Sequence, residues 1–308
     1  MAGSREERCL GQVRQLRQYR TIRECVREYG YPVDCVCKIL DVSRAGYYRW
    51  VTGKTSKRAA KNKELADKIE AIHMESPDKG YRRIRDDLQH DYGIHINDKH
   101  VLRICRVKKI KSTIKYQNNG CTRHAKNPQY VAENLLDRDF HATKPNTKWL
   151  TDVTEFKWNE GTVIHKIYLS AILDLYDRRI VAFVVSERND NALVFKTLDR
   201  AIAANPDAHP LFHSDRGFQY TNRTFHHKLE HASMIQSMSR VAHCIDNGPM
   251  EGFWGILKRE RYYGRHFTSE QELSSMIHSY ISYYNSRRVQ RNLGILTPLE
   301  KYNAFLAA

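Results

Sequence analysis

Apolar positions change their spacing near residue 149, which divides the chain into two differently patterned parts. Before that point, apolar residues recur every three or four positions, as on one face of a helix. After it, short runs rich in valine, isoleucine and aromatic residues alternate with helical stretches. Runs of that composition favour strands. The pattern predicts a helical N-terminal region followed by an α/β region.

The N-terminal region contains two candidate helix-turn-helix units. We expect a helix over residues 5–29 and, after Pro32, a pair of short helices in which Ser43 is an N-cap. This pair fits a helix-turn-helix and an ordinary helical hairpin equally well. A charged connector (54–63) and a helix (64–74) are expected next.

The second candidate pair lies between Gly80 and Lys111 and is strongly basic. Its first helix should end at Gly93, and Asn97 is a suitable N-cap for the next helix. Eight basic residues and no acid lie between Arg103 and Lys126. Since a basic helix can enter the major groove and contact phosphates, we predict DNA contacts by Arg103, Arg106, Lys108, Lys109 and Lys111.

Charge is distributed unevenly along the chain. Residues 1–150 contain 32 Lys and Arg against 18 Asp and Glu, whereas residues 151–308 contain 19 against 17. The asymmetry favours a nucleic-acid-binding module joined to a near-neutral domain; a solvated basic surface is the alternative. No run of 18 apolar residues and no apolar leader is present, and the seven cysteines are irregularly spaced. We therefore expect a cytoplasmic protein with no membrane partner.

Five strands and several helices are predicted after residue 148. The strands are Trp149–Lys157, Val163–Leu175, Ile180–Val185, Leu211–Ser214 and Ile235–Met238. Helices are expected up to Ala204 with Asn191 as the cap, over 222–231, from Pro249 with Gly248 as the cap, and over 269–284. This order predicts a ribonuclease H-like core, a mixed five-stranded sheet with helices, preceded by an all-α helix-turn-helix region.

Three acids fall on separate elements of this core. Asp152 lies in the first strand, Asp215 follows the fourth, and Glu251 lies in the first turn of a late helix, 35 residues beyond Asp215. Mg²⁺ prefers oxygen ligands and leaves positions open for phosphate oxygens and water. Two such ions can activate the attacking oxygen and stabilise the leaving one. The acids therefore predict a phosphoryl-transfer site with two Mg²⁺ or Mn²⁺ ions.

Two side chains near these acids have alternative interpretations. At 100° per residue, Lys258 shares a helix face with Glu251. There it would contact DNA near the scissile phosphate, or would simply be a solvated lysine. His213 lies on the same strand face as Asp215. It either steers water or DNA, or is a buried, hydrogen-bonded histidine.

Several ordered motifs resemble one family. HSDRGFQYT, SMSR, DNGPMEGFWGILKRE and YYNSRRVQRNLGILTPLEKY are similar to the second-frame product (OrfB) of insertion-sequence transposases of the two-frame, frameshifting family. KGYRRIRDDL and PNTKWLTDVTEF resemble its helix-turn-helix region and its first catalytic motif. The resemblance covers most of the chain and places it in the DDE superfamily, together with the retroviral integrases.

The resemblance implies a DNA transposase, a metal-dependent polynucleotidyl transferase with the triad Asp152, Asp215 and Glu251. Matching positions near the triad are Arg216, Gln219, Tyr220, Asn247 and Lys258. The expected partners are double-stranded DNA at the terminal inverted repeats and at the target, and further copies of the chain in a homo-oligomer. The family resemblance also implies a circular intermediate and a bacterial, nucleoid-associated location.

The family's first reading frame supplies a further helix-turn-helix and a leucine zipper. Because this chain shows no sustained heptads, we expect a fused or separate first-frame partner. The predicted segments are an N-terminal helical region (1–53), a basic helix-turn-helix region (54–111), a linker (112–145), the catalytic core (146–265) and a C-terminal helical segment (266–308). Two other functions remain open: a non-catalytic DNA-binding regulator, and a ribonuclease H or resolvase-type nuclease without joining activity.

Overall fold

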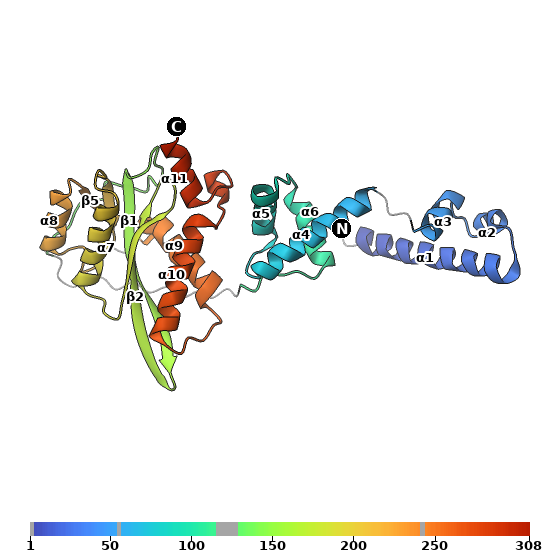
Figure 1. The fold of residues 1–308 in the computed structure, drawn as a ribbon, viewed down its shortest axis with the longest axis horizontal. Helices are drawn as coiled ribbons and strands as arrows, with labels where there is room; N and C mark the ends of the chain where they lie inside the picture. Colours follow the sequence, from blue (N-terminus) through green and yellow to red (C-terminus); the bar gives the residue numbers. More distant parts are fainter. Residues whose placement is uncertain (1–2, 54–56, 115–128, 241–243) are drawn as a thin grey trace. The chain divides into compact units, whose positions relative to one another are not determined.

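The computed structural model describes residues 3–53, 57–114, 129–240 and 244–308 (Figure 1). The chain forms two compact units, Met1–Asp67 and Lys68–Ala308. Within the described ranges, no helix is both long and apolar enough to cross a membrane.

The first unit contains α1 (Gly3–Tyr29), α2 (Val33–Ile39) and α3 (Arg44–Val51). The three expected helices are therefore confirmed. As predicted, Ser43 is the N-cap of α3, and its hydroxyl accepts a hydrogen bond from the Gly46 amide at 3.4 Å. The small core joins α1 to the α2–α3 pair through Tyr19, Ile22, Val36, Cys37 and Tyr47.

The helix α4 (Lys57–Glu75) is longer than expected. The predicted connector 54–63 is wrong from Lys57 onward, because alanine and straight-chain residues there favour a helix despite their charge. The next two helices are α5 (Tyr81–Tyr92) and α6 (Asp98–Val107). As predicted, α5 ends at Gly93, whose φ is 63°, and Asn97 caps α6 by accepting from the Lys99 amide.

A five-stranded mixed sheet forms the centre of the second unit, with the order β3-β2-β1-β4-β5. Its strands are β1 (Lys148–Glu160), β2 (Val163–Asp174), β3 (Ile180–Ser186), β4 (Leu211–Ser214) and β5 (Ile235–Met238). The β1–β2 and β2–β3 pairs are antiparallel, whereas β1–β4 and β4–β5 are parallel. The predicted sheet is confirmed, and β1 is longer at both ends than expected.

Helices cover both faces of the sheet. On one face, α7 (Asn191–Ala204) and α8 (Arg223–His231) pack over Trp149 and Phe212. On the other, α9 (Gly248–Leu257) and α10 (Glu270–Ser286) pack over Leu150 and its neighbours (Figure 1). The predicted inner side of α10 is buried as expected: Leu273, Ile277, Tyr280, Ile281 and Tyr284.

Two helix caps differ from the prediction. The N-cap of α7 is Asp190, whose carboxylate accepts from the Leu193 amide at 3.0 Å, and not Asn191. The N-cap of α9 is Asn247, which ends the short helix η1 (Cys244–Asn247), and not Gly248. In both places two adjacent residues suit a helix start, and the first of the two is the cap.

The remaining elements extend the core toward the C-terminus. A π-helical segment, η2 (Lys258–Tyr262), continues α9 directly. After α10 come η3 (Arg291–Leu293) and α11 (Pro298–Leu306), whose start is a capping box formed by Thr297 and Glu300.

The later part of the segment expected to be a linker packs against the core. The Tyr130 amide donates to the Thr221 carbonyl at 2.9 Å, and Ala132, Leu136 and Ala142 are buried. The earlier part, including the basic residues Lys115, Arg123 and Lys126, lies outside the described residues.

A buried group of charges joins α5 to the core; we call Arg83, Glu260, Tyr280 and Arg288 the Glu260 cluster. Both Arg83 and Arg288 donate to Glu260, at 2.9 and 2.8 Å, and the Tyr280 hydroxyl donates to it at 3.0 Å. The Glu260 side chain is only 4% exposed. The carboxylate is therefore matched by two cations and fully hydrogen-bonded, as a buried charge requires.

Candidate active site

One predicted acid, Asp152, lies in β1, and another, Asp215, directly follows the neighbouring parallel strand β4. Leu150 of β1 pairs with His213 of β4, so Asp152 and Asp215 lie two residues beyond a matched pair. Side chains alternate across a strand, so Asp152 shares the face of Leu150, which packs against α9. The parallel register therefore places both carboxylates at one edge of the sheet, on the α9 side.

The third acid, Glu251, is exposed in the first turn of α9. Although Glu251 keeps contact with solvent, its pKa is raised, first by partial desolvation of the carboxylate and then by the negative charge of Asp215. The pKa of Asp152 is raised to about 8, first by burial, then by the charge of Asp215 and, more weakly, of Glu251. The structure thus makes the three predicted acids electrostatic neighbours.

The donor set suits a hard divalent cation. Among the described residues, no three Asp, Glu, His or Cys side chains already converge closely enough to enclose a metal ion. The three acids nevertheless offer only carboxylate oxygens, the ligands that Mg²⁺ and Mn²⁺ prefer. Desolvation and, after it, the negative charge of Asp215 raise the pKa of Asp152 and of Glu251, and a bound cation would offset both effects.

The loop after β4 holds Asp215 through its own backbone. The Gly217 amide donates to Asp215 Oδ1 at 2.9 Å. Tyr220 is buried with its hydroxyl 3.3 Å from Thr151 Oγ1, beside Asp152. Because the Thr151 hydroxyl donates to the Ala171 carbonyl, Tyr220 is the donor in this contact. The predicted Gln219 is buried too, and its amide donates to Asn189.

The helix α9 makes two polar contacts with β1 at the level of Asp152. The predicted Asn247 donates its side-chain amide to the Thr151 carbonyl at 3.1 Å. Trp254 donates its indole N–H to Asp152 Oδ2 at 2.9 Å. Trp254 was absent from the sequence prediction, although it lies three residues after Glu251 and therefore near the same helix face.

Lys258, the first residue of η2, lies against the strand that contains Asp152. Its Nζ is 5.1 Å from the centre of the Phe156 ring, on the strand that contains Asp152. Burial lowers the pKa of Lys258, while Asp152 and Glu155 oppose that shift. The side chain is only partly exposed, which does not match a fully solvated lysine.

His213 and Arg216 are hydrogen-bonded to β5 and to Ser239, which follows it. Both ring nitrogens of His213 are hydrogen-bonded, to Ser237 Oγ at 2.8 Å and Ser239 Oγ at 3.1 Å. Burial lowers the pKa of His213 to about 4, so it is a buried, hydrogen-bonded, neutral histidine. Arg216 donates through Nε to the Ser239 carbonyl at 2.8 Å.

The basic residues predicted to contact DNA lie on α6 and just beyond it. Arg103, Arg106, Lys108, Lys109 and Lys111 are all exposed. Lys108 forms an ion pair with Glu70 at 3.1 Å. The opposite face of α6 is buried through Val101, Ile104 and Cys105, so the helix presents its cations to solvent.

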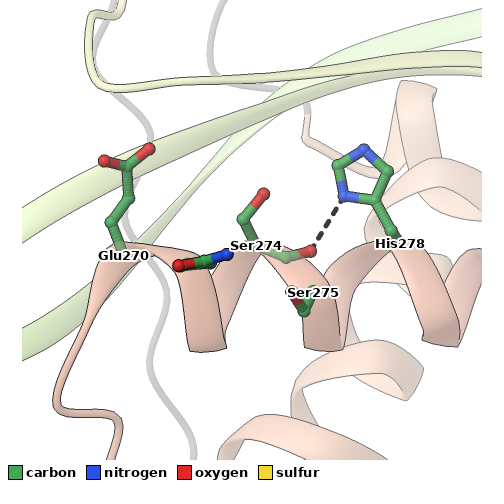
Figure 2. Close-up of a pocket in the computed structure, with 5 residues that line it drawn as sticks. Glu270, Ser274, Ser275 and His278 are labelled. Atoms are coloured by element: carbon green, nitrogen blue, oxygen red, sulfur yellow. Dashed lines mark hydrogen bonds between the residues drawn. The ribbon is translucent and has the colours of Figure 1, made fainter.

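A surface hollow on α10 is unrelated to the acids. It is lined by Glu270, Gln271, Ser274, Ser275 and His278, all from one helix. Figure 2 shows His278 bonded back to the Ser274 carbonyl of its own helix, at 2.9 Å. None of the predicted site residues lines this hollow, and we assign it no role in the chemistry.

Known protein families match both the helical region that contains α5 and α6 and the α/β region that contains the acids. The family described as "Integrase core domain" matches residues 142–244, which include Asp152 and Asp215. A second family with the same description matches 251–304, beginning at Glu251. The family described as "HTH-like domain" matches 60–118, which includes α5 and α6.

Curated relatives are transposases of insertion sequences. The chain is 37% identical over 275 residues to the "Putative transposase InsK for insertion sequence element IS150" of Escherichia coli, covering 89% of this chain and 94% of the relative. It is 29% identical to "Transposase InsF for insertion sequence IS3A" of the same organism, covering 90% and 96%.

Among solved structures, the catalytic core of the HTLV-2 integrase, titled as a complex with magnesium, is similar with a TM-score of 0.41 and 18% identity. The match covers 53% of this chain and 99% of the integrase core. The mixed sheet, the family matches and the curated relatives together show that the chain belongs to the OrfB-type transposases of insertion sequences, within the DDE and retroviral-integrase superfamily.

Proposed function

We propose that Asp152, Asp215 and Glu251 hold two Mg²⁺ or Mn²⁺ ions, with which this transposase cleaves and joins DNA at the ends of its element. The observation that supports this site is geometric: the parallel register of β1 and β4 places Asp152 near Asp215, and α9, which contains Glu251, is hydrogen-bonded to Asp152 through Trp254. Bound ions would supply activation of the attacking oxygen and stabilisation of the leaving oxygen.

The protein's own residues position the reacting groups and neutralise negative charge, and none of them attacks the phosphodiester. The Gly217 amide holds the Asp215 carboxylate, and Lys258 provides a cation beside Asp152. We infer that Lys258 contacts the phosphate next to the scissile bond. In the first step water attacks the phosphodiester at the element end, and the strand breaks to leave a 3′-hydroxyl. In the second, that hydroxyl attacks another phosphodiester, and one P–O bond forms as another breaks.

Buried polar residues support the acids in this proposal. Tyr220 and Asn247 contact Thr151, the residue before Asp152. Gln219 and His213 hold the loop and strand around Asp215 through buried hydrogen bonds. Tyr220 and Asn247 contact the residue next to Asp152, and Gln219 and His213 lie within four residues of Asp215, so we assign all four a positioning role.

DNA binding is assigned to the exposed cations on and after α6, together with Arg216. Lysine and arginine contacts to phosphate position a protein on DNA without reading its sequence. The proposed substrates are the terminal inverted repeats and the target duplex. The proposed domains are those predicted from the sequence: a DNA-binding region at 54–111 and a catalytic core at 146–265.

Assembly is proposed on chemical grounds. Joining two element ends requires both ends at one time, which favours a homo-oligomer on nucleoid DNA and a circular intermediate. A first-frame product, fused or separate, would add the helix-turn-helix and the zipper expected from the family resemblance.

A labelled duplex that contains one element end tests this function with purified protein and Mg²⁺. We expect nicks with a 3′-hydroxyl and slower joined products. Asp215→Asn and Glu251→Gln should abolish both, whereas the control Glu155→Gln, a partly exposed acid also on β1, should keep both. Nicking and joining at wild-type rates by either triad variant would refute the site.

The same assay separates the two alternative functions. A regulator would bind the duplex in EDTA and cleave nothing when Mg²⁺ is added. A nuclease without joining activity would give nicks and no joined product at any Mg²⁺ concentration.

A further inference from the structure

The indole of Trp254 makes a direct contact with a proposed metal ligand. Its N–H donates to Asp152 Oδ2 at 2.9 Å, while its ring lies in the core that α9 shares with the sheet. The side chain of Trp254 is 6% exposed, and its ring packs against Phe253 at 5.1 Å between centroids. The indole ring is therefore held in the core while its N–H reaches Asp152.

Tryptophan suits this contact chemically. The indole nitrogen is a donor only, stays neutral, and has one direction of donation. A lysine or arginine in its place would neutralise Asp152 and compete with a cation for the carboxylate. The indole therefore orients the carboxylate and leaves its negative charge intact.

Repulsion within the site gives the contact its importance. The parallel register of β1 and β4 places Asp152 near Asp215, and like charges favour rotation of the two carboxylates away from each other. A hydrogen bond to one oxygen of Asp152 resists that rotation. Replacing a group that orients a metal ligand in this way typically lowers metal affinity or activity by about 10- to 100-fold.

The contact also joins two triad elements. Glu251 lies three residues before Trp254 on α9, and Asp152 lies in β1. Asn247, at the start of α9, donates to the Thr151 carbonyl at 3.1 Å. The helix with Glu251 is thus hydrogen-bonded to the strand with Asp152 at two points, one before and one after Glu251 in sequence.

We propose that Trp254 is a positioning residue for the metal site: its indole N–H orients Asp152 for metal binding and, with Asn247, holds α9 in place against β1. This proposal rests on the assignment of Asp152 and Glu251 as metal ligands.

Calorimetric titration of the full chain with Mg²⁺, without DNA, tests it. Trp254→Phe retains an aromatic ring and removes the N–H, and we expect the Kd for Mg²⁺ to rise about tenfold. Cleavage by this variant should require more Mg²⁺ and recover at saturating Mg²⁺, which a general folding defect would not do. The matched control is Trp149→Phe, because the Trp149 indole also donates to a carboxylate, Asp174, at 3.1 Å. That variant should bind Mg²⁺ as tightly as wild type.

The variant Asp152→Asn separates the role proposed for Trp254 from the metal-site assignment on which that role rests. If Asp152→Asn binds Mg²⁺ like wild type, the metal site itself is wrong. If Asp152→Asn loses binding while Trp254→Phe keeps wild-type affinity, the site stands and the role of Trp254 is wrong.

A second measurement covers the case in which Trp254→Phe does not fold. In wild-type protein labelled with ¹⁵N-tryptophan, the indole N–H signal of Trp254 should shift as Mg²⁺ binds, with the midpoint given by calorimetry. The signals of Trp50, Trp149 and Trp158 serve as internal controls. An unshifted Trp254 signal at saturating Mg²⁺ would overturn the proposal.

Discussion

Gly217 lies so close to Asp215 that its missing side chain matters. Its amide donates to Asp215 Oδ1, and a Cβ at this position would lie 3.0 Å from the same oxygen. Gly217→Ala must therefore move the carboxylate or the loop. Because small displacements of reacting groups are costly, we expect single-turnover cleavage to fall about 10- to 100-fold, with a melting temperature close to that of wild type.

Gly252 provides the matched control for that variant. It follows Glu251 on α9, and a Cβ there would meet nothing within 4 Å. Gly252→Ala should keep wild-type cleavage and stabilise the helix by about 0.5–1 kcal/mol. Equal losses of cleavage in the two variants would show that bulk near the acids, and not the position of Asp215, limits the rate.

Asp246 is the buried acid that organises the start of α9. It is fully buried and accepts hydrogen bonds from Arg138, at 2.7 Å, and from Arg240, at 3.0 Å. Asp246→Asn removes the charge that both arginines face. We expect a loss of about 2 kcal/mol in the free energy of unfolding at pH 7, because both arginines are 43% exposed and water can partly replace the carboxylate.

The pH dependence of that loss has a definite sign. Hydrogen bonds from Arg240, and then Arg138, hold the pKa of Asp246 well below its usual range. The folded state therefore binds this proton more weakly than the unfolded state, whose carboxyl titrates near pH ~3.9. The stabilisation is complete above that pH and declines as the pH falls below it. Urea unfolding at pH 7 and pH 3 should show the difference between wild type and Asp246→Asn shrinking at pH 3; a constant difference would contradict the assignment.

At the scale of elements, the exposed cations of α6 predict how the affinity for DNA depends on salt concentration. Arg103 and Arg106 are exposed on the face of α6 that is not buried. If each contacts one phosphate, Arg103→Ala/Arg106→Ala should reduce the slope of log K against log salt by about 2. The control Lys144→Ala/Lys196→Ala removes two exposed charges outside the DNA-binding region 54–111 and should leave that slope unchanged. An unchanged slope in the α6 variant would remove α6 from the DNA interface.

Strands were the elements best predicted from the sequence. The bounds of β4 and β5 agree exactly with the β-branched and aromatic runs that predicted them, and β2 and β3 differ by one residue at one end. The run 57–63 was wrong because its charges resemble those of a connector, whereas its backbone preference is helical. Adjacent Asp190 and Asn191 both suit a cap, so local pattern could not choose between them.

At the scale of the whole second unit, the Glu260 cluster predicts how α5 and the core unfold. Arg83 and Arg288 both bind the buried Glu260 carboxylate. Arg83→Met leaves that carboxylate with less compensation, and we expect a loss of about 3 kcal/mol. We also expect α4–α6 to unfold before the core in hydrogen exchange. The control is Arg82→Met, an exposed neighbour on α5, and equal effects of the two variants would argue against the cluster.

The long-range contacts could not be predicted from the sequence. Arg83 and Glu260 are 177 residues apart, and each on its own resembles a solvated surface charge. Trp254 looks like one more apolar position of α9 until β1 brings Asp152 to its indole. The three acids, in contrast, could be predicted, because the ends of strands and the first turn of a helix are recognisable in the sequence. Neighbouring parallel strands then bring Asp152 and Asp215 together.

The central claim is that one metal-binding site draws its ligands from β1, the loop after β4 and α9. Fe²⁺ in place of Mg²⁺, with ascorbate and peroxide, generates radicals that cut the polypeptide next to the bound ion. We predict cuts near Asp152, Asp215 and Glu251 together, suppressed by excess Mg²⁺ and absent from Asp215→Asn. Cuts confined to other segments, or cuts that excess Mg²⁺ does not suppress, would contradict the account.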